Sequence, residues 1–369
     1  MNSKTESPPS ALTFCRIEAG EREEELLQSI REILHEGASH NAEFFDAALW
    51  NWQYKNLPTH QSAVYVCLDD GKISGYYHVP FYEGIIRGEK KKFGVVQDVA
   101  VSKRLRGGGV FNQLASFATE DLLKSGIDFL YTFPNDKSIH TFLKYNGYST
   151  VHTFDTFILP VKTSLLIQSK VKLFGLEKII GAAADLFFKR SFALKKDEQI
   201  SVNKNFDDAT VGLFEKFSSR FPVHRARTKN YLQWRYVEKP TVNHVIVSLK
   251  AGTQTIAAAV FRTDVILNVN SLLLMDFAFE EEAQLAKLIH YVRMHSKEIF
   301  AEQAAMIFTA FCCNDFLKTK RYGFIRIPKK FNPRNLNLLA RTAEVKTEDT
   351  EELFKKENWF ATPGDWDVF

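Results

Sequence analysis

The sequence has few cysteines and lacks a long apolar run. Its four cysteines (Cys15, Cys67, Cys312 and Cys313) form neither a C-x-x-C zinc spacing nor a disulfide framework, which favours a reducing compartment. No run of 18 or more apolar residues occurs, so no transmembrane helix is predicted. Residues 1–14, MNSKTESPPSALTF, lack the apolar core of a signal peptide and predict a disordered lead-in. We therefore expect a cytoplasmic protein with no metal site and no integral membrane insertion.

Strong charge of either sign is also missing. The net charge is +4 over 369 residues, far below the density of basic residues in a nucleic-acid-binding protein, so no nucleic-acid partner is predicted. Hydrophobic residues make up 45% of the chain, and the 32 phenylalanines indicate well-filled cores. The length is more than one domain usually needs, which favours two domains.

The most informative stretch is QDVAVSKRLRGGGVFNQL, residues 97–114. An apolar strand ending at Val101 leads into a short basic loop, three glycines and a helical apolar pattern that begins at Val110. Glycines allow backbone N–H groups to approach an anion, and a helix N-terminus adds partial positive charge, so the turn suits a phosphate group. It is neither a Walker loop, because no Gly-Lys-Ser/Thr follows, nor a Gly-x-Gly-x-x-Gly dinucleotide fingerprint.

The elements around this turn have a definite order. The apolar pattern predicts two helices, then a hairpin at Gly71–Lys72, then the strand before the glycines. After the glycine turn it predicts a helix to about Lys124, a strand ending at Pro134, a helix ending at Gly147 and a last strand. The predicted ranges are helices 20–35 and 41–50, strand 94–101, helix 110–124, strand 126–134, helix 135–147 and strand 151–161.

Both the element order and VAVSKRLRGGGVFNQL resemble the GNAT superfamily of N-acetyltransferases, whose pyrophosphate loop reads Arg/Gln-x-x-Gly-x-Gly/Ala after a strand. Two registers fit: Arg104-x-x-Gly107-x-Gly109 matches the motif literally, and Arg106-x-x-Gly109-x-Phe111 gives the more usual distance from the strand, which we prefer. FPNDKSIHTFLKYNGYSTV resembles the closing segment of the family. The resemblance implies acetyl-coenzyme A as co-substrate, and as its binding residues Val99, Ala100, Val101, Arg104, Arg106, Gly107, Gly108, Gly109, Val110, Phe111 and Asn135.

The second half of the chain repeats the first. Asp276 in LLLMDFAF answers Asp98 in VVQDVAV, and FLKTKRYGF answers FLKYNGY. Three further residues match at one common offset: Trp234, Tyr236 and Pro240 correspond to Trp52, Tyr54 and Pro58.

The repeat lacks the glycine loop. Where it should recur, the chain has Glu280, Glu281 and Glu282, and carboxylates would repel a pyrophosphate. We therefore expect the second half to keep the fold and to have lost the cofactor site.

These matches predict an α/β protein with two GNAT-like domains in tandem, each a mixed, mainly antiparallel sheet flanked by helices. The predicted ranges are the lead-in 1–14, a catalytic domain 15–160, a helical connector 161–200 and a degenerate domain 201–369. Residues 163–195 are helical, apolar and dotted with lysine, which suits either a packed connecting helix or a helix lying on a membrane surface.

Two residues are candidates for proton transfer. Asp98 lies in an otherwise apolar strand, where a carboxylate is costly without a partner or a purpose, so it is the candidate base; the alternative is a structural carboxylate. The resemblance implies a tyrosine as general acid at the position of Leu143, and Tyr145 should point elsewhere. His140 lies one turn before Leu143 and is the other candidate. Asn135 also suits a helix cap.

The motifs Trp50-Asn-Trp52-Gln-Tyr54 and Trp234-Arg235-Tyr236 offer stacking and charge for an acceptor. Trp52, Tyr54 and Arg235 are therefore candidate substrate-binding residues, with core packing as the alternative. The activity implied by the resemblance is transfer of an acetyl or other short acyl group to a small-molecule primary amine by direct attack, with an amino sugar or nucleotide-sugar among the acceptors. The alternatives are a FemAB-type aminoacyl transferase and a non-catalytic protein that binds or senses coenzyme A.

Overall fold

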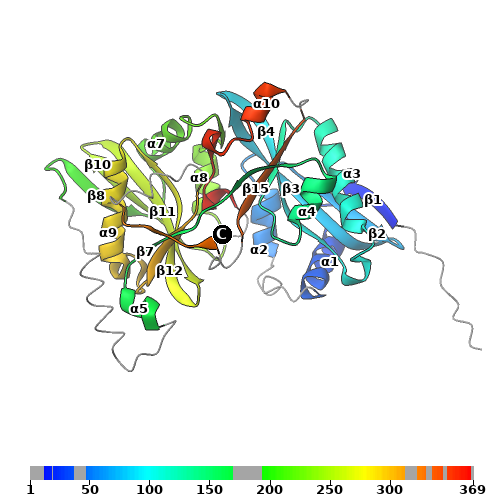
Figure 1. Ribbon diagram of the computed structural model, residues 1–369, viewed down its shortest axis with the longest axis horizontal. Helices are drawn as coiled ribbons and strands as arrows, with labels where there is room; N and C mark the ends of the chain where they lie inside the picture. The colour runs from blue at the N-terminus through cyan, green and yellow to red at the C-terminus, as the bar shows by residue number, and fades with distance from the viewer. Residues whose placement is uncertain are drawn as a thin grey trace, which may run out of the picture. The chain divides into compact units, whose positions relative to one another are not determined.

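The computed structural model describes residues 12–18, 20–36, 47–168, 193–311, 322–329, 335–343 and 347–366 (Figure 1). The chain forms two compact units. Unit 1 comprises residues 1–83, 91–150 and 338–346, and unit 2 comprises residues 84–90, 151–337 and 347–369. Each unit contains a mixed sheet flanked by helices, which confirms the predicted fold class.

The strands of unit 1 follow the order β1-β2-β3-β4-β5-β15-β6 across its sheet. The predicted hairpin is present, but it turns at Asp70 and Gly71, one residue earlier than expected, with Asp69 opposite Lys72. β4 and β5 are parallel, and β15 runs antiparallel to β5. The bounds are β1 (Leu12–Ile17), β2 (Ser62–Asp69), β3 (Lys72–Ile86), β4 (Glu89–Val101), β5 (Phe129–Thr132), β6 (Ser149–Thr153) and β15 (Asn337–Thr342).

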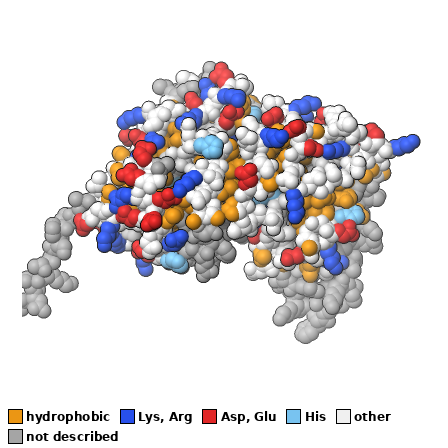
Figure 2. All heavy atoms as spheres, turned by 180° about the vertical axis from the view of Figure 1, so that it is seen from behind, with side chains coloured by type: hydrophobic (Ala, Val, Ile, Leu, Met, Phe, Trp, Pro, Cys, Tyr) orange, Lys and Arg blue, Asp and Glu red, His pale blue; other side chains and the backbone are white. Residues whose placement is uncertain are grey.

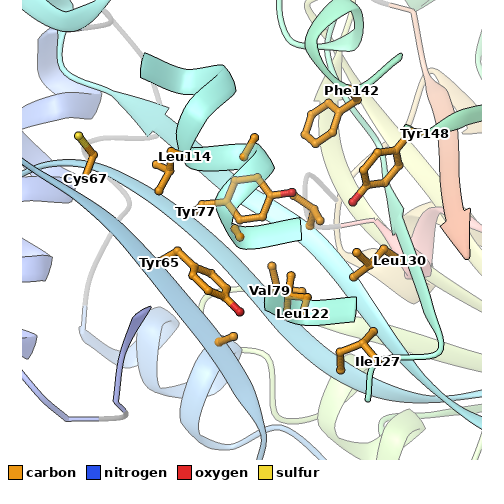
Figure 3. Close-up of a cluster of buried hydrophobic side chains, with 14 of the residues drawn as sticks. Tyr65, Cys67, Tyr77, Val79, Leu114, Leu122, Ile127, Leu130, Phe142 and Tyr148 are labelled. Carbon is orange, nitrogen blue, oxygen red and sulfur yellow. The ribbon is translucent and has the colours of Figure 1, made fainter. Parts of the chain in front are cut away.

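Helices cover both faces of this sheet. On one face, α3 (Val110–Lys124) and α4 (Ile139–Tyr145) enclose a core that includes Tyr65, Tyr77 and Leu114 (Figure 3). On the other face, α1 (Glu23–Glu36), the short α2 (Ala47–Trp50) and the π-helical turn η2 (Asn51–Lys55) pack against β2 and β3. Because side chains alternate along a strand, neighbouring residues of β2 and β3 supply the two cores.

Unit 2 has the strand order β14-β7-β13-β12-β11-β10-β8. β12 and β13 are parallel, and the other strand pairs among the described residues of this sheet are antiparallel. Phe217 of α7 packs on Phe277 and Phe279 of β12. The bounds are β7 (Phe157–Pro160), α5 (Thr163–Gln168), β8 (Glu198–Asn203), α7 (Asp208–Ser218), β9 (Val223–Arg225), α8 (Lys229–Tyr236), β10 (His244–Ala251), β11 (Gln254–Ile266), β12 (Val269–Phe279), α9 (Glu282–Phe300), β13 (Met306–Thr309), β14 (Ile325–Arg326), α10 (Glu348–Glu352) and β16 (Trp359–Phe360).

The two halves of the sequence exchange strands. The predicted single strand 151–161 was wrong: β6 ends at Thr153, the chain bends, and β7 begins at Phe157 in the other sheet. In return, β15 crosses from the C-terminal half and lies between β5 and β6. The bend is anchored where the Phe154 N–H donates to the Leu336 carbonyl at 2.8 Å. Each sheet is therefore completed by a strand from the other half of the chain.

Several predicted ranges need adjustment. The lead-in ends earlier than predicted, because residues 12–14 belong to β1 and pair with β2. β8 begins at Glu198, inside the predicted connector, and residues 169–192 of that connector lie outside the described residues, as do 41–46, 312–321 and both C-terminal cysteines. Among the described helices, none is long and apolar enough to cross a membrane. Basic and acidic side chains are interspersed over the described part of the face in Figure 2.

Candidate active site

The glycine turn joins β4 to α3 as predicted. After Val101 the chain makes a 3-10 turn, η3 (Lys103–Leu105), and then passes through Gly107 (φ 85°) and Gly109 (φ 75°), which caps α3. Left-handed backbone favours glycine at these two positions, whereas Gly108 has ordinary φ. The first intrahelical bond of α3 runs from Gln113 N–H to Gly109 O at 3.1 Å, so the preceding N–H groups of the first turn have no acceptor inside the helix. These N–H groups and the helix dipole form a site that suits a phosphate.

Phe111, at the last position of the preferred motif register, is accommodated by the core. Its ring lies edge-on to Phe142 of α4, with centroids 6.4 Å apart and an interplanar angle of 86°. Phe111 is thus half-buried against the core formed by α3 and α4. A phenylalanine at this position therefore leaves the turn itself open, and a Cβ atom added at Gly107 would have no neighbour within 4 Å.

Beside this turn, β4 extends beyond the end of β5. Their parallel pairing runs from Phe93 and Phe129 to Val96 and Thr132, where β5 ends, while β4 continues to Val101. The Thr132 hydroxyl donates to Val96 O at 2.9 Å at the end of this pairing. The predicted cofactor residues Val99, Ala100 and Val101 lie in the part of β4 beyond it.

The backbone of β4 is irregular at Asp98. Its φ is 48°, a conformation that is rare for a non-glycine residue. Residues held in such sparsely populated conformations cluster at active sites. The irregular point falls between the end of the β5 pairing and the glycine turn.

Asp98 forms the centre of a polar cluster in unit 1. Its carboxylate accepts hydrogen bonds from the Tyr54 hydroxyl and from Gln53 Nε2, the latter at 2.7 Å. Gln53 and Tyr54 come from the π-helical turn η2, and such turns often occur at functional sites. The Tyr54 ring packs against Trp50 and His78, with centroids 4.4 and 4.6 Å away. The structure thus brings together the predicted residues Tyr54 and Asp98, and Trp52 is buried in the same turn.

Sequence reasoning missed Gln53. A glutamine between two aromatic residues carries no signal of its own. Its contact with Asp98 depends on how η2 packs on the sheet, across 45 positions of sequence.

The corresponding cluster in unit 2 is fully buried. Asp276 is fully buried and accepts from the Tyr236 hydroxyl at 2.8 Å and from Arg227 Nε at 2.9 Å. Arg227 also pairs with Asp365 of the C-terminal segment at 2.7 Å. Burial raises the pKa of the Asp276 carboxyl, while the Arg227 guanidinium opposes that shift. Asp98, by contrast, is only half-buried. The Asp–Tyr pair therefore serves packing in unit 2, whereas in unit 1 Tyr54 is buried and Asp98 stays partly exposed.

The acidic residues that replace the glycine loop in unit 2 also have structural contacts. Glu280 accepts from Lys216 Nζ at 3.1 Å and from Gln254 Nε2 at 2.9 Å. Glu281 forms a capping box with Gln284 at the start of α9. The negative charge at this helix start disfavours a phosphate, in line with the expected loss of the cofactor site.

Arg235, a predicted substrate residue, is buried within unit 2. Its guanidinium donates to the carbonyls of Gly364 at 2.6 Å and Trp366 at 2.7 Å. Trp234 and Tyr236 on the same helix are also buried. These contacts match the packing alternative for the Trp-Arg-Tyr motif.

The two basic residues of the glycine turn make different contacts. Arg104 pairs with the Asp69 carboxylate and donates from Nη2 to the Ser74 hydroxyl at 2.9 Å. Arg106 donates from Nε to Val101 O at 3.2 Å and is exposed. Arg106 therefore borders the open turn, whereas the guanidinium of Arg104 lies against the β2–β3 hairpin.

The residues predicted near α4 are mostly exposed. His140 is exposed and lies edge-on to Tyr145, with centroids 6.1 Å apart. Leu143, where the family has its acid, is 40% exposed. Asn135 Oδ1 accepts from the N–H groups of Lys137 at 2.9 Å and Ser138 at 3.1 Å, so its oxygen organises the turn before α4. The roles of His140 and Asn135 in a reaction remain predictions.

Comparisons with known proteins agree with this architecture. A family model described as an acetyltransferase (GNAT) domain matches residues 23–151. No curated protein matches the chain in sequence. Among solved structures, the chain is similar to a GCN5-related N-acetyltransferase from Anabaena variabilis, with a TM-score of 0.59 and 9% identity over 90% of this chain and 73% of that one.

Two further structures have the same fold. A probable N-acyltransferase from Enterococcus faecalis aligns with a TM-score of 0.60 and 12% identity, over 91% of this chain and 73% of that one. N-myristoyltransferase from Saccharomyces cerevisiae, with bound myristoyl-CoA, aligns with a TM-score of 0.57 and 13% identity, over 94% and 86%. The matched residues 23–151 contain β2 to β5 and the glycine turn. Residues 23–151, about a third of the chain, are thus identified as a GNAT acetyltransferase domain.

Proposed function

We propose that unit 1 transfers an acetyl or other short acyl group from coenzyme A to a primary amine. Unit 2 is the degenerate GNAT-like partner. The observation that carries this proposal is the glycine turn, in which left-handed Gly107 and Gly109 precede the start of α3 and leave backbone N–H groups open to a phosphate. The equivalent turn in unit 2 has glutamates instead.

The geometry of β4 supports the same assignment. Beyond Val96, β4 continues without its β5 pairing, so its main chain from Val99 to Val101 can bind an extended pantetheine arm. The N–H groups at the start of α3 and the exposed Arg106 would hold the pyrophosphate. The arm would then lead the thioester toward Asp98, next in the same strand.

In this arrangement Asp98 is the proton acceptor. The amine nitrogen attacks the thioester carbonyl, a C–N bond forms, and the C–S bond breaks to release coenzyme A. The proton lost by the amine passes to the Asp98 carboxylate, and the departing thiolate takes up a proton from solvent to leave as the thiol. Tyr54 and Gln53 hold the carboxylate in position through their hydrogen bonds.

The acceptor we propose is a small amine, with amino sugars and nucleotide-sugars as the first compounds to test. The half-buried Asp98 accepts from Tyr54, whose ring packs on Trp50. The partly exposed carboxylate can pair with the ammonium group of such an acceptor before the amine loses its proton. Leu143 at the position of the usual acid supports a second candidate, a protein that binds coenzyme A without turnover.

The deciding measurement is thermal unfolding with and without acyl-coenzyme A. Ligand at about 100 times its dissociation constant should stabilise the fold by about 2.7 kcal/mol. Acetyl-, hexanoyl- and myristoyl-coenzyme A are compared, because the yeast neighbour holds a long acyl chain. If none of the three ligands shifts the unfolding temperature, the proposed coenzyme A site is wrong.

Thiol release in the presence of an amine panel then separates an enzyme from a binding protein. Replacing the proposed base, Asp98→Asn, should lower kcat by about 10²- to 10⁴-fold, because the amide cannot accept the proton. The dissociation constant for acyl-coenzyme A should stay close to that of the wild type. Unchanged kcat in this variant would remove Asp98 from the mechanism, and ligand binding without thiol release from any amine would favour the sensor.

A further inference from the structure

Asp69 is a buried carboxylate that faces the glycine turn. It ends β2 at the hairpin, and its side chain is 1% exposed. Its charge is met by the guanidinium of Arg104, which is 57% exposed. In the described part of the chain, neither Asp69 oxygen accepts a well-formed hydrogen bond from another group. The charge of Asp69 therefore depends on Arg104.

The residues beside Arg104 are tied to the same region. Ser102 N–H donates to Ser74 O at 2.9 Å, and Arg104 Nη2 donates to the Ser74 hydroxyl at the same distance. Lys103 N–H donates to Glu36 at the end of α1, at 2.6 Å. Three consecutive residues at the start of the turn are thus fixed to β3, α1 and β2.

These contacts indicate which of the two arginines, Arg104 or Arg106, can bind a phosphate. If its guanidinium turned toward a bound pyrophosphate, Asp69 would be left as a buried charge without a partner, which is strongly unfavourable. Arg106 makes one bond to a backbone carbonyl and can reach an anion at no such cost. The contacts therefore favour the register Arg106-x-x-Gly109 over Arg104-x-x-Gly107.

We propose that Arg104 and Asp69 are positioning residues, whose ion pair anchors the glycine turn to the β2–β3 hairpin so that its N–H groups meet the pyrophosphate. This inference rests on the proposed function. It differs from the family pattern read literally, in which Arg104 itself would contact phosphate.

The variant Asp69→Asn should change coenzyme A binding differently if Arg104 anchors the turn than if Arg104 binds phosphate. If Arg104 anchors the turn, removing the Asp69 charge loosens the turn, and the dissociation constant for coenzyme A rises about tenfold, equivalent to about 1.4 kcal/mol. If Arg104 is a phosphate ligand, the same change releases it toward the ligand, and the dissociation constant stays equal or falls. Calorimetric titration of the full-length chain with coenzyme A measures this, and the second result overturns the proposal.

A double-mutant cycle tests the pair directly. Arg104→Gln should weaken coenzyme A binding about tenfold, and the double variant Asp69→Asn/Arg104→Gln by about the same factor rather than about a hundredfold, because both changes break one interaction. Arg104→Lys, which keeps a charge, should restore part of the affinity. Additive losses in the double variant would contradict the anchor.

The control is Lys103→Gln, which removes one charge from the same turn and leaves the Asp69 pair intact. It should change the dissociation constant by less than about threefold. In turnover, the anchor variants should raise KM for acyl-coenzyme A while kcat and the acceptor KM stay within about twofold of wild type, which general loss of stability would not produce. If wild-type protein binds no acyl-coenzyme A, the proposed function fails; if it binds and Asp69→Asn binds equally well, only the anchor fails.

Discussion

His78 of β3 is buried among aromatic rings, and within the described ranges neither of its ring nitrogens has a hydrogen-bond partner. Its neighbours Trp50, Tyr54 and Tyr76 have ring centroids 4.8, 4.6 and 5.3 Å away. Burial lowers the pKa of the His78 imidazole from 6.5 to about 3. The residue therefore packs as a neutral ring beside the Tyr54–Asp98 pair. Because its protonation is disfavoured in the folded state, it makes the stability of the fold depend on pH.

The depressed pKa predicts a pH dependence of stability. Between pH 6.5 and about 3 the unfolded state binds a proton at His78 that the folded state does not, so stability falls as pH falls through this window. The loss approaches about 1.4 kcal/mol per pH unit for one histidine. His78→Leu should reduce the slope of the unfolding free energy against pH by about that amount. The exposed-site variant His35→Gln serves as control, and an unchanged slope in His78→Leu would contradict the prediction.

Two glycines of unit 2 make a matched pair with opposite expected effects. A Cβ atom at Gly364 would overlap Tyr236 Oη, whereas one at Gly212 on helix α7 would have no neighbour within 4 Å. Gly364→Ala should therefore destabilise by about 1–3 kcal/mol through overpacking. Gly212→Ala should stabilise by about 0.5–1 kcal/mol through reduced backbone freedom of the unfolded chain. Chemical unfolding measures both, and a Gly364→Ala protein of wild-type stability would show that the C-terminal segment packs loosely.

Single residues were predictable where the signal was local. Asp98 could be selected because a carboxylate in an apolar strand is costly, and the structure gives it a partner in Tyr54. That partner lies 44 positions away in sequence, so no local pattern could reveal it. The burial of Arg235 was equally hidden, because its acceptors Gly364 and Trp366 come from the far end of the chain.

At the scale of elements, the strand–glycine–helix unit formed by β4, the turn and α3 is the best predicted part of the molecule. Its signals are local, since the apolar end of the strand, the three glycines and the apolar helical pattern all lie within Gln97–Lys124. The break between β6 and β7 was not predictable in the same way, because no glycine interrupts residues 151–161, which were predicted as one strand. What separates the two strands is their pairing with different sheets, which depends on contacts distant in sequence.

The turn offers a prediction that separates two neighbouring glycines. Gly109 has a φ of 75°, a conformation in which a Cβ atom costs about 1–2 kcal/mol. Gly108 has an ordinary φ, and a Cβ atom added there would lie 3.8 Å from the nearest atom. Gly109→Ala should therefore distort the start of α3 and weaken coenzyme A binding by about tenfold or more. Gly108→Ala is the matched control and should bind within about threefold of wild type. Titration calorimetry measures both, and equal affinities for the two variants would contradict the assigned role of Gly109.

At the scale of the whole molecule, the strand exchange makes the folding of each half of the sequence depend on the other half. β15 lies between β5 and β6 in the first sheet, and β7 lies between β13 and β14 in the second. The repeat in the sequence indicated two similar halves, and it carried no sign that each half lends a strand to the other. Internal sequence similarity indicates which segments share a fold. It does not indicate the sheet in which β7 or β15 pairs.

The exchange predicts that the range expected as a catalytic domain, residues 15–160, does not fold by itself. Without β15, the β5 strand loses the partner that pairs Leu339 with Thr132 and Thr342 with Phe129, and an apolar sheet edge is exposed. The fragment 1–160 should therefore aggregate or unfold without a cooperative transition. Fragments 1–180 and 181–369, produced together, should instead copurify as a complex, because each supplies a strand to the other sheet. Size-exclusion chromatography and thermal unfolding check both results, and a monomeric fragment 1–160 with cooperative unfolding would show that β15 is dispensable to the first sheet.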